Sequence, residues 1–327
     1  MKKLLAILLA LAVLCSVSVC AFAADTDTMV FTWEDVAEDL ADIDEDGAFH
    51  QVGDYVLWLP SFFEDQELSD ERLEQGYIAN IMATDESAAV IAFTDTNEEG
   101  ADLEVLAEAY TGAGLEAEVV EVNGKPAMLY VDESSDTLNL LFLKEDDNTA
   151  ETVISFYPLS DEGFSSLAAM VLNTVQPGIL WSTVEEFAAM VDEDADFYQI
   201  GDYDLAMWIP SPLGETELTD EDIENGYIAY LMTDDGEDGV SVTVTPAEGV
   251  TLKELKEFYE EEGIEGVELG LINGIPVLTY TYDETDSMNA LFMSDDDEFM
   301  QVSCWPASDD NFSTVATLIM SSIQVIE

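Results

Sequence analysis

The stretch FHQVGDYVLWLP at Phe49–Pro60 decides the fold, because nearly the same stretch, FYQIGDYDLAMWIP, occurs again at Phe197–Pro210. Further along, ELSDERLEQGYIA from Glu67 returns as ELTDEDIENGYIA from Glu217. The copies are separated by about 150 residues, far more than the roughly 20 to 50 residues of a solenoid repeat. A unit of this length can bury a core of its own, so the repeat indicates that a whole domain occurs twice.

The repeat covers most of the chain, since Trp33–Gln176 matches Trp181–Gln324. We therefore predict a first domain over residues 24–177 and a second over residues 178–327. A short Pro-Gly linker at Pro177 separates them.

Within each copy the hydrophobic period changes in the same order: helix, strands, helix, strands and a closing helix. Asn-Gly pairs at Asn123 and Asn273 predict a hairpin in each copy. Ser182 and Glu185 have capping-box spacing, which predicts that the first helix of the second copy begins at Ser182. This order predicts an α+β fold, in which each domain is a mainly antiparallel sheet flanked by helices.

Short helices are predicted where a capping residue is followed by a glycine stop. Ser69 and Thr219 are suitable N-caps, and Gly76 and Gly226 can end the helices in a left-handed conformation.

Several of these features together resemble the PsbP-like family. They are a strand ending in proline, a helix, the Asn-Gly hairpin, the strand SFYP at Ser155–Pro158 and a closing helix ending near SSI at Ser321–Ile323. The family has an α/β/α sandwich fold. It includes extrinsic subunits of photosystem II, a relative that binds a nuclear-transport GTPase, and many secreted bacterial proteins. The resemblance covers both halves and implies two PsbP-like domains with a non-catalytic adaptor or binding role, without assigning any functional residue.

The composition combines an extreme charge with enough apolar residues for a core. The chain has 7 Lys and Arg against 73 Asp and Glu, a formal net charge of −66. Such a charge repels phosphate backbones and anionic head groups, so we exclude nucleic acid and acidic membranes as direct partners. Because 48% of the residues are hydrophobic, the chain is expected to fold.

Residues 1–23 have the features of a signal peptide: two lysines, the apolar run Leu4–Cys20 and an Ala-Phe-Ala cleavage pattern. Neither Cys15 nor Cys20 stands in a lipobox, so we predict simple secretion to the extracellular space. Cys304 would then be the single remaining cysteine, which excludes an intramolecular disulfide. No later stretch reaches about 18 uninterrupted apolar residues, so no membrane insertion is predicted after signal removal.

Few residues suggest catalysis. His50 is the single histidine, and its counterpart in the second copy is Tyr198, so a structural role is favoured over that of a general base. Cys304 corresponds to Phe156, which favours a buried core residue over an activated thiol. The sequence lacks G-x-S-x-G, G-x-G-x-x-G and G-x-x-x-x-G-K motifs. We predict no catalytic or cofactor-binding residue.

One acidic segment, Asp42–Gly47, matches the opening D-x-D-x-D-G of a calcium loop, in which alternate carboxylates converge on one cation. Gly53 stands where the loop's final Glu belongs, and Phe197 replaces the glycine in the second copy. Two alternatives stay open: a calcium site in each copy, or solvated loops between helix and strand. The candidate metal ligands are Asp42, Asp44, Asp46, Asp192, Asp194 and Asp196.

Aromatic residues recur at the same places in both copies, as Trp33, Trp58 and Tyr77 and as Trp181, Trp208 and Tyr227. Exposed rings on an acidic secreted module could stack on sugars. Their alternation within strands favours packing between sheet and helix.

The sequence predicts a secreted, non-catalytic binding or adaptor protein built from two acidic domains. Its expected partner is an extracellular protein, a glycan or a cation. The alternatives are a carboxylate-based extracellular hydrolase, which needs two carboxyl groups about 5 to 10 Å apart, and a calcium-dependent structural module.

Overall fold

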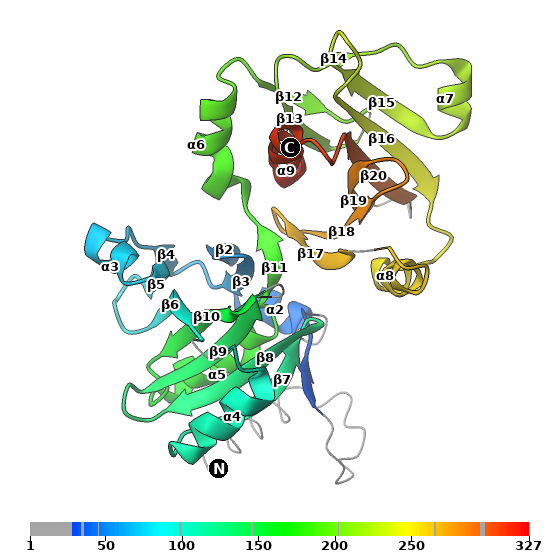
Figure 1. Ribbon diagram of the computed structural model, residues 1–327. Coiled ribbons are helices and arrows are strands. Elements are labelled where there is room, and N and C mark those ends of the chain that lie inside the picture. The colour runs from blue at the N-terminus through cyan, green and yellow to red at the C-terminus, as the bar shows by residue number, and fades with distance from the viewer. Residues whose placement is uncertain are drawn as a thin grey trace. The chain divides into compact units, whose positions relative to one another are not determined.

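The computed structural model describes residues 28–33, 36–44, 46–97, 100–144, 147–201, 203–264, 266–294 and 298–326 (Figure 1). The chain divides into two compact units, Met1–Gln176 and Pro177–Glu327. The predicted signal peptide, residues 1–23, lies outside the described residues. Among the helices that the structure describes, none is both long enough and apolar enough to cross a membrane.

The first unit contains an eight-stranded sheet with the order β1-β7-β8-β9-β10-β6-β5-β4. β1 pairs with β7 in parallel, and the other neighbours pair antiparallel. These strands are β1 (Met29–Phe31), β4 (Phe63–Asp65), β5 (Tyr77–Ala83), β6 (Ala89–Thr96), β7 (Glu116–Val122), β8 (Lys125–Asp132), β9 (Thr137–Lys144) and β10 (Asp147–Tyr157). The unit also contains the hairpin of β2 (Ala48–Val52) and β3 (Tyr55–Leu59) and the helices α2 (Ala37–Ile43), α3 (Asp70–Glu74), α4 (Leu103–Gly112) and α5 (Glu162–Leu172).

The second unit repeats this order as β11-β17-β18-β19-β20-β16-β15-β14. Its strands are β11 (Gln176–Ile179), β14 (Gly214–Glu215), β15 (Tyr227–Met232), β16 (Gly239–Pro246), β17 (Glu268–Ile272), β18 (Ile275–Tyr282), β19 (Ser287–Met293) and β20 (Glu298–Trp305). A smaller sheet joins β12 (Asp196–Gln199), β13 (Leu205–Ile209) and β21 (Gln324–Val325), and the helices are α6 (Trp181–Val191), α7 (Asp220–Glu224), α8 (Leu252–Glu261) and α9 (Asp310–Ser321). The predicted α+β fold, with mainly antiparallel sheets flanked by helices, is confirmed.

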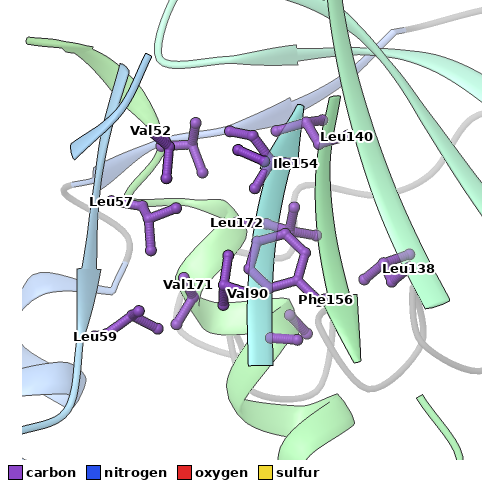
Figure 2. Close-up of a cluster of buried hydrophobic side chains, with 14 of the residues drawn as sticks. Val52, Leu57, Leu59, Val90, Leu138, Leu140, Ile154, Phe156, Val171 and Leu172 are labelled. Carbon is purple, nitrogen blue, oxygen red and sulfur yellow. The ribbon is translucent and has the colours of Figure 1, made fainter. Parts of the chain in front are cut away.

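Different helices cover the two faces of each sheet. In the first unit α5 and the β2–β3 hairpin pack on one face, where the largest buried cluster lies. Figure 2 shows part of this cluster, with labelled side chains Val52, Leu57, Leu59, Val90, Leu138, Leu140, Ile154, Phe156, Val171 and Leu172. On the opposite face α4 packs through Leu103 against Met128, Leu141 and Val153. In the second unit α9 and α8 take the places of α5 and α4.

The local helix signals are confirmed at the short helices. Ser69 and Thr219 are the N-caps of α3 and α7, and each side chain accepts a hydrogen bond from the helix backbone. Gly76 and Gly226 follow these helices with φ of 86° and 87°, the left-handed conformation that glycine adopts without strain.

The first helix of the second unit begins earlier than predicted. α6 starts at Trp181 with Leu180 as its N-cap, so Ser182 lies inside the helix and the predicted Ser182–Glu185 capping box is wrong. The backbone N–H of Trp181 instead donates to Oδ1 of Asn273, at 2.5 Å. A side chain 92 residues away therefore provides the acceptor that the local sequence was expected to supply.

The turn asparagines Asn123 and Asn273 each connect three segments of their unit. Oδ1 of Asn123 accepts from the N–H of Trp33 at 2.8 Å, and its Nδ2 donates to the carbonyls of Asn173 and Val175 at 2.8 and 2.9 Å. Asn273 makes the same three bonds, with Trp181, Ser321 and Ile323. Each predicted Asn-Gly hairpin is confirmed, and its tip holds the segment that follows the first strand (β1 or β11) and the end of the closing helix together.

We expect Asn123→Gly to lower the free energy of unfolding of the first unit by about 2 to 4 kcal/mol, because two carbonyl groups lose their donor. Glycine tolerates the φ of 47° at this position, so backbone strain does not contribute. Urea denaturation followed by tryptophan fluorescence measures the change. The control Asn225→Gly alters an exposed residue after α7 and should cost less than about 1 kcal/mol. Equal losses for the two variants would contradict the prediction.

Candidate functional site

The two residues considered for catalysis have structural surroundings. His50 is buried in β2, and its Nδ1 lies 3.0 Å from Oδ2 of Asp65. At the equivalent positions the hydroxyl of Tyr198 donates to Glu215 at 3.2 Å, so both units place a polar pair here. Cys304 is fully buried in β20, and burial raises the pKa of its thiol. The prediction that Cys304 is a core residue is confirmed.

The recurring tryptophans belong to the core. Trp58, Trp181 and Trp208 are buried, and Trp181 packs against Trp208 with ring centroids 6.2 Å apart. Trp33 is half-buried and lies 5.4 Å from the ring of Phe49. The packing interpretation is confirmed for these rings.

In each unit the acidic loop after the first helix is hydrogen-bonded to the turn that follows the next hairpin. Oδ2 of Asp44 accepts from the N–H and the hydroxyl of Ser61, both at 2.8 Å. Asp192 accepts from Ser211 in the same way, at 2.7 and 2.8 Å. These bonds hold the pKa of Asp44 and of Asp192 below the usual range of a carboxyl group. The structural counterpart of Asp44 is thus Asp192, the first acidic residue of the second loop.

The other candidate metal ligands lie around these two aspartates. Asp46 and Asp194 donate their backbone N–H to Oδ1 of Asp44 and Asp192, and both side chains are exposed. Asp42 is exposed within α2, and Asp196 opens β12. Among the described residues, no group of three or more His, Cys, Asp or Glu side chains has the arrangement to hold a metal ion.

The calcium hypothesis stays a prediction, and it has a direct test. If calcium binds the loops, millimolar calcium should raise the melting temperature more than sodium chloride at the same ionic strength does. The excess should shrink in Asp46→Asn, which keeps the bonds between Asp44 and Ser61, and disappear when Asp194→Asn is added. Equal shifts with the two salts, or an excess that survives both substitutions together, would refute the hypothesis. Circular dichroism melts are sufficient for this comparison.

One pair of carboxylates in the first unit is unusual. Glu151 on β10 is 6% exposed and stands directly opposite Asp95 on β6. Burial, and then the charge of Asp95, raise the pKa of Glu151. The rings of Tyr110 and Tyr130 pack edge to face nearby, and the pKa of each hydroxyl is raised by burial and by the charge of Glu151. Glu151 is therefore the described carboxyl group that best fits a proton donor.

We expect Glu151→Gln to raise the melting temperature at pH 7. A raised pKa means that the folded chain favours protonated Glu151, so this stabilisation is complete below the unfolded pKa of about 4.5 and is lost as the pH rises through the folded value. The gain from Glu151→Gln should therefore shrink towards zero below about pH 4.5. Glu118→Gln removes one charge from an exposed strand position and is the control. A gain that is the same for both variants, or that does not depend on pH, would contradict the prediction.

A cavity of about 310 Å³ opens in the second unit between α9 and the strands β17, β18 and β19. Its walls are mainly apolar, with Ile272, Val277 and Met320 buried among them. Hydroxyl groups of threonines on β18 and α9 also line it, at Thr279, Thr281 and Thr317. This volume lies within the range of small-molecule sites, about 300 to 1,000 Å³.

The first unit has large apolar residues at the matching positions. Thr279, Thr281 and Met288 on β18 and β19 correspond to Leu129, Val131 and Leu138 on β8 and β9. These three side chains are 0 to 2% exposed and belong to the core of the first unit.

The neighbouring strand β17 also has a smaller residue than its counterpart β7 in the first unit. Gly270 on β17 takes the place of Val120, and a Cβ at Gly270 would lie only 2.7 Å from the carbonyl oxygen of Pro177. The second unit thus has the smaller Thr279 in place of Leu129, while the backbone of Pro177 occupies the space in front of Gly270. No sequence signal marked these residues, because each is ordinary on its own and the volume lost appears only when the strands are assembled.

The chain was compared with protein families, curated proteins and solved structures. No family model matches, and no curated protein matches. Among solved structures, the PsbP protein CyanoP from Synechocystis sp. PCC 6803 is similar with 13% identity and a TM-score of 0.29, over 40% of this chain and 92% of that chain. The immunity protein TplEi of the Pseudomonas aeruginosa T6SS is similar with 9% identity and a TM-score of 0.22, over 85% of this chain and 98% of that chain. The PsbP-like resemblance thus has a distant structural match over part of the chain.

Proposed function

We propose that this chain is an exported, non-catalytic binding protein of two PsbP-like domains, and that the second unit holds the ligand. The observation that carries the proposal is the cavity beside α9, where the first unit has the core residues Leu129 and Val131 in place of Thr279 and Thr281. An unfilled cavity loses packing energy, at about 24 cal/mol for each Å³ in mutant proteins. A region that is packed with side chains in one unit and forms a cavity in the other supports ligand binding in that cavity.

The walls indicate the kind of ligand. Apolar side chains cover most of the surface. The hydroxyls of Thr279 and Thr317 already donate to the carbonyls of Glu268 and Ser313, so they can accept a hydrogen bond from a ligand. Glu268 is the charged residue among the lining residues, so an anionic ligand is disfavoured here and by the net charge of −66. We therefore assign the site to a small, uncharged, mainly apolar molecule with one or two polar groups.

The neutral probe N-phenyl-1-naphthylamine, which fluoresces strongly in apolar surroundings, tests this function. We expect saturable binding to the intact chain, weakened at least tenfold by Thr279→Leu with Thr281→Val, which restores the side chains of the first unit. The matched control is Thr243→Leu with Thr245→Val on β16, outside the cavity lining, and it should leave binding unchanged. Melting curves establish that both double variants are folded. Unchanged binding after the cavity is filled would refute the proposal.

A carboxylate-based hydrolase is the alternative, and the raised pKa of Glu151 opposite Asp95 is the observation that favours it. In that case hydrolysis of a glycan by the protein would be lost in Glu151→Gln and retained in Glu118→Gln. Such a result would replace the binding function by an enzymatic one in the first unit.

A further inference from the structure

A second and larger cavity lies on the opposite face of the second unit, at the carboxyl end of α8. It has a volume of about 940 Å³, and α8, the end of β18 and the turn that follows β18 line it. The rings in its walls are those of Phe258, Tyr259, Tyr280 and Tyr282. Phe258 is 53% exposed, so much of its ring is open to the solvent and to a ligand.

The rings are held in place by their neighbours. Tyr259 packs edge to face on Tyr280 with centroids 4.9 Å apart, and Phe258 lies 6.0 Å from Tyr259. The hydroxyl of Tyr280 donates to Gln301 at 3.1 Å, and the hydroxyl of Tyr282 donates to Glu284 at 3.0 Å. The cavity therefore has a fixed aromatic wall.

The other wall is negative. Glu262 follows the last residue of α8, and Asp283 and Glu284 occupy the turn after β18. The carbonyl groups at the end of a helix add the partial negative charge of its dipole. Lys256, on the same helix, pairs with Glu260 at 3.3 Å and is not among the residues that line the cavity.

The first unit lacks this combination. Phe258 and Glu262 correspond to Ala109 and Ala113 at the end of α4, and Tyr282 corresponds to Asp132 at the end of β8. Tyr259 and Tyr280, which pack the helix on the sheet, are present in both units as Tyr110 and Tyr130. The shared tyrosines thus serve the fold, whereas Phe258, Tyr282 and Glu262 are additions that packing does not require.

We propose that this cavity is a binding site for an organic ammonium ion. Aromatic faces attract a cation through their quadrupole, by about 0.5 to 2 kcal/mol for each well-placed ring. Carboxylates supply the charge, and the net charge of −66 steers cations towards the protein. A metal ion would gain little from the rings, and a neutral ligand would gain hydrogen bonds but no charge pairing from the carboxylates, so the combination favours a cation with an organic body. This site adjoins the cavity beside α9 on which the proposed function rests, because Gly266, Tyr280 and Thr281 line both, but Phe258, Glu262 and Tyr282 line this site alone.

The probes are n-butylammonium, tetramethylammonium and the peptide acetyl-Gly-Lys-Gly-amide, titrated into the full chain in about 0.15 M sodium chloride and followed by NMR. At that ionic strength the Debye length is about 8 Å, so diffuse attraction is largely screened. Saturable binding is expected, with the largest shifts at the amides of Gly263 and Ile264, which line this cavity and not the one beside α9. Tighter binding of the peptide indicates the lysine of a partner protein as the natural ligand, and tighter binding of the small cations indicates a free amine. Both results support the ammonium site.

Two matched pairs of variants distinguish binding at this site from the general attraction of cations to the negatively charged protein. Phe258→Ala should weaken binding about fivefold or more, while Phe187→Ala, which removes an equally exposed phenylalanine from α6, should not change it. Glu262→Gln should weaken binding more than Glu261→Gln, which removes the same charge one residue earlier and outside the cavity lining. All four residues are on the surface, so the variants should fold, as melting curves can establish. Absence of saturable binding, or equal effects within either pair, would overturn the proposal.

Discussion

Each unit depends on the side chain of one asparagine at the tip of a hairpin. A β-hairpin, the segment after the first strand and a closing helix are far apart in the sequence, and ordering them together costs conformational entropy. Asn123 and Asn273 satisfy one N–H and two carbonyl groups at this junction, so the end of the closing helix is not left with unpaired acceptors. Both lie at positive φ, where asparagine is tolerated better than most residues. The same asparagine therefore satisfies both the backbone conformation of the turn and the hydrogen bonds of the junction.

The hydrogen bonds of this junction stabilise a fold that the net charge of the chain opposes. Self-repulsion among 73 acidic groups opposes the compact state, and few cations in the chain can relieve it. The acidic residues lie mainly at exposed positions, and several cap helices or close turns. Asp102, Asp161 and Asp309 accept from the backbone at the starts of α4, α5 and α9. Among the acidic residues whose burial the structure describes, Glu151 is the exception, because it is buried opposite Asp95.

The sequence predicted features whose cause is local. Asn-Gly turns, glycine stops after α3 and α7, and the closing helices all depend on a few neighbouring residues, and the structure has them where expected. The start of α6 could not be predicted in this way, because its acceptor is Asn273 and not Ser182. The cavities were missed for a related reason. Threonine at position 279 is a good strand residue, and its lack of volume matters only beside Gly270 and Thr281.

Duplication explains why the second unit can carry both cavities. Residues that maintain the fold, such as the turn asparagines and the tyrosine pair under α4 or α8, are the same in both units. Residues that line the cavities differ between the two units, and they lie around the residues that the units share. Substituting leucine by threonine inside a single domain would cost packing energy with nothing to offset it except a ligand. Since Thr279 replaces Leu129 in the wall of a cavity while the junction of the second unit is kept, ligand binding is the reason that we propose for the difference between the two copies.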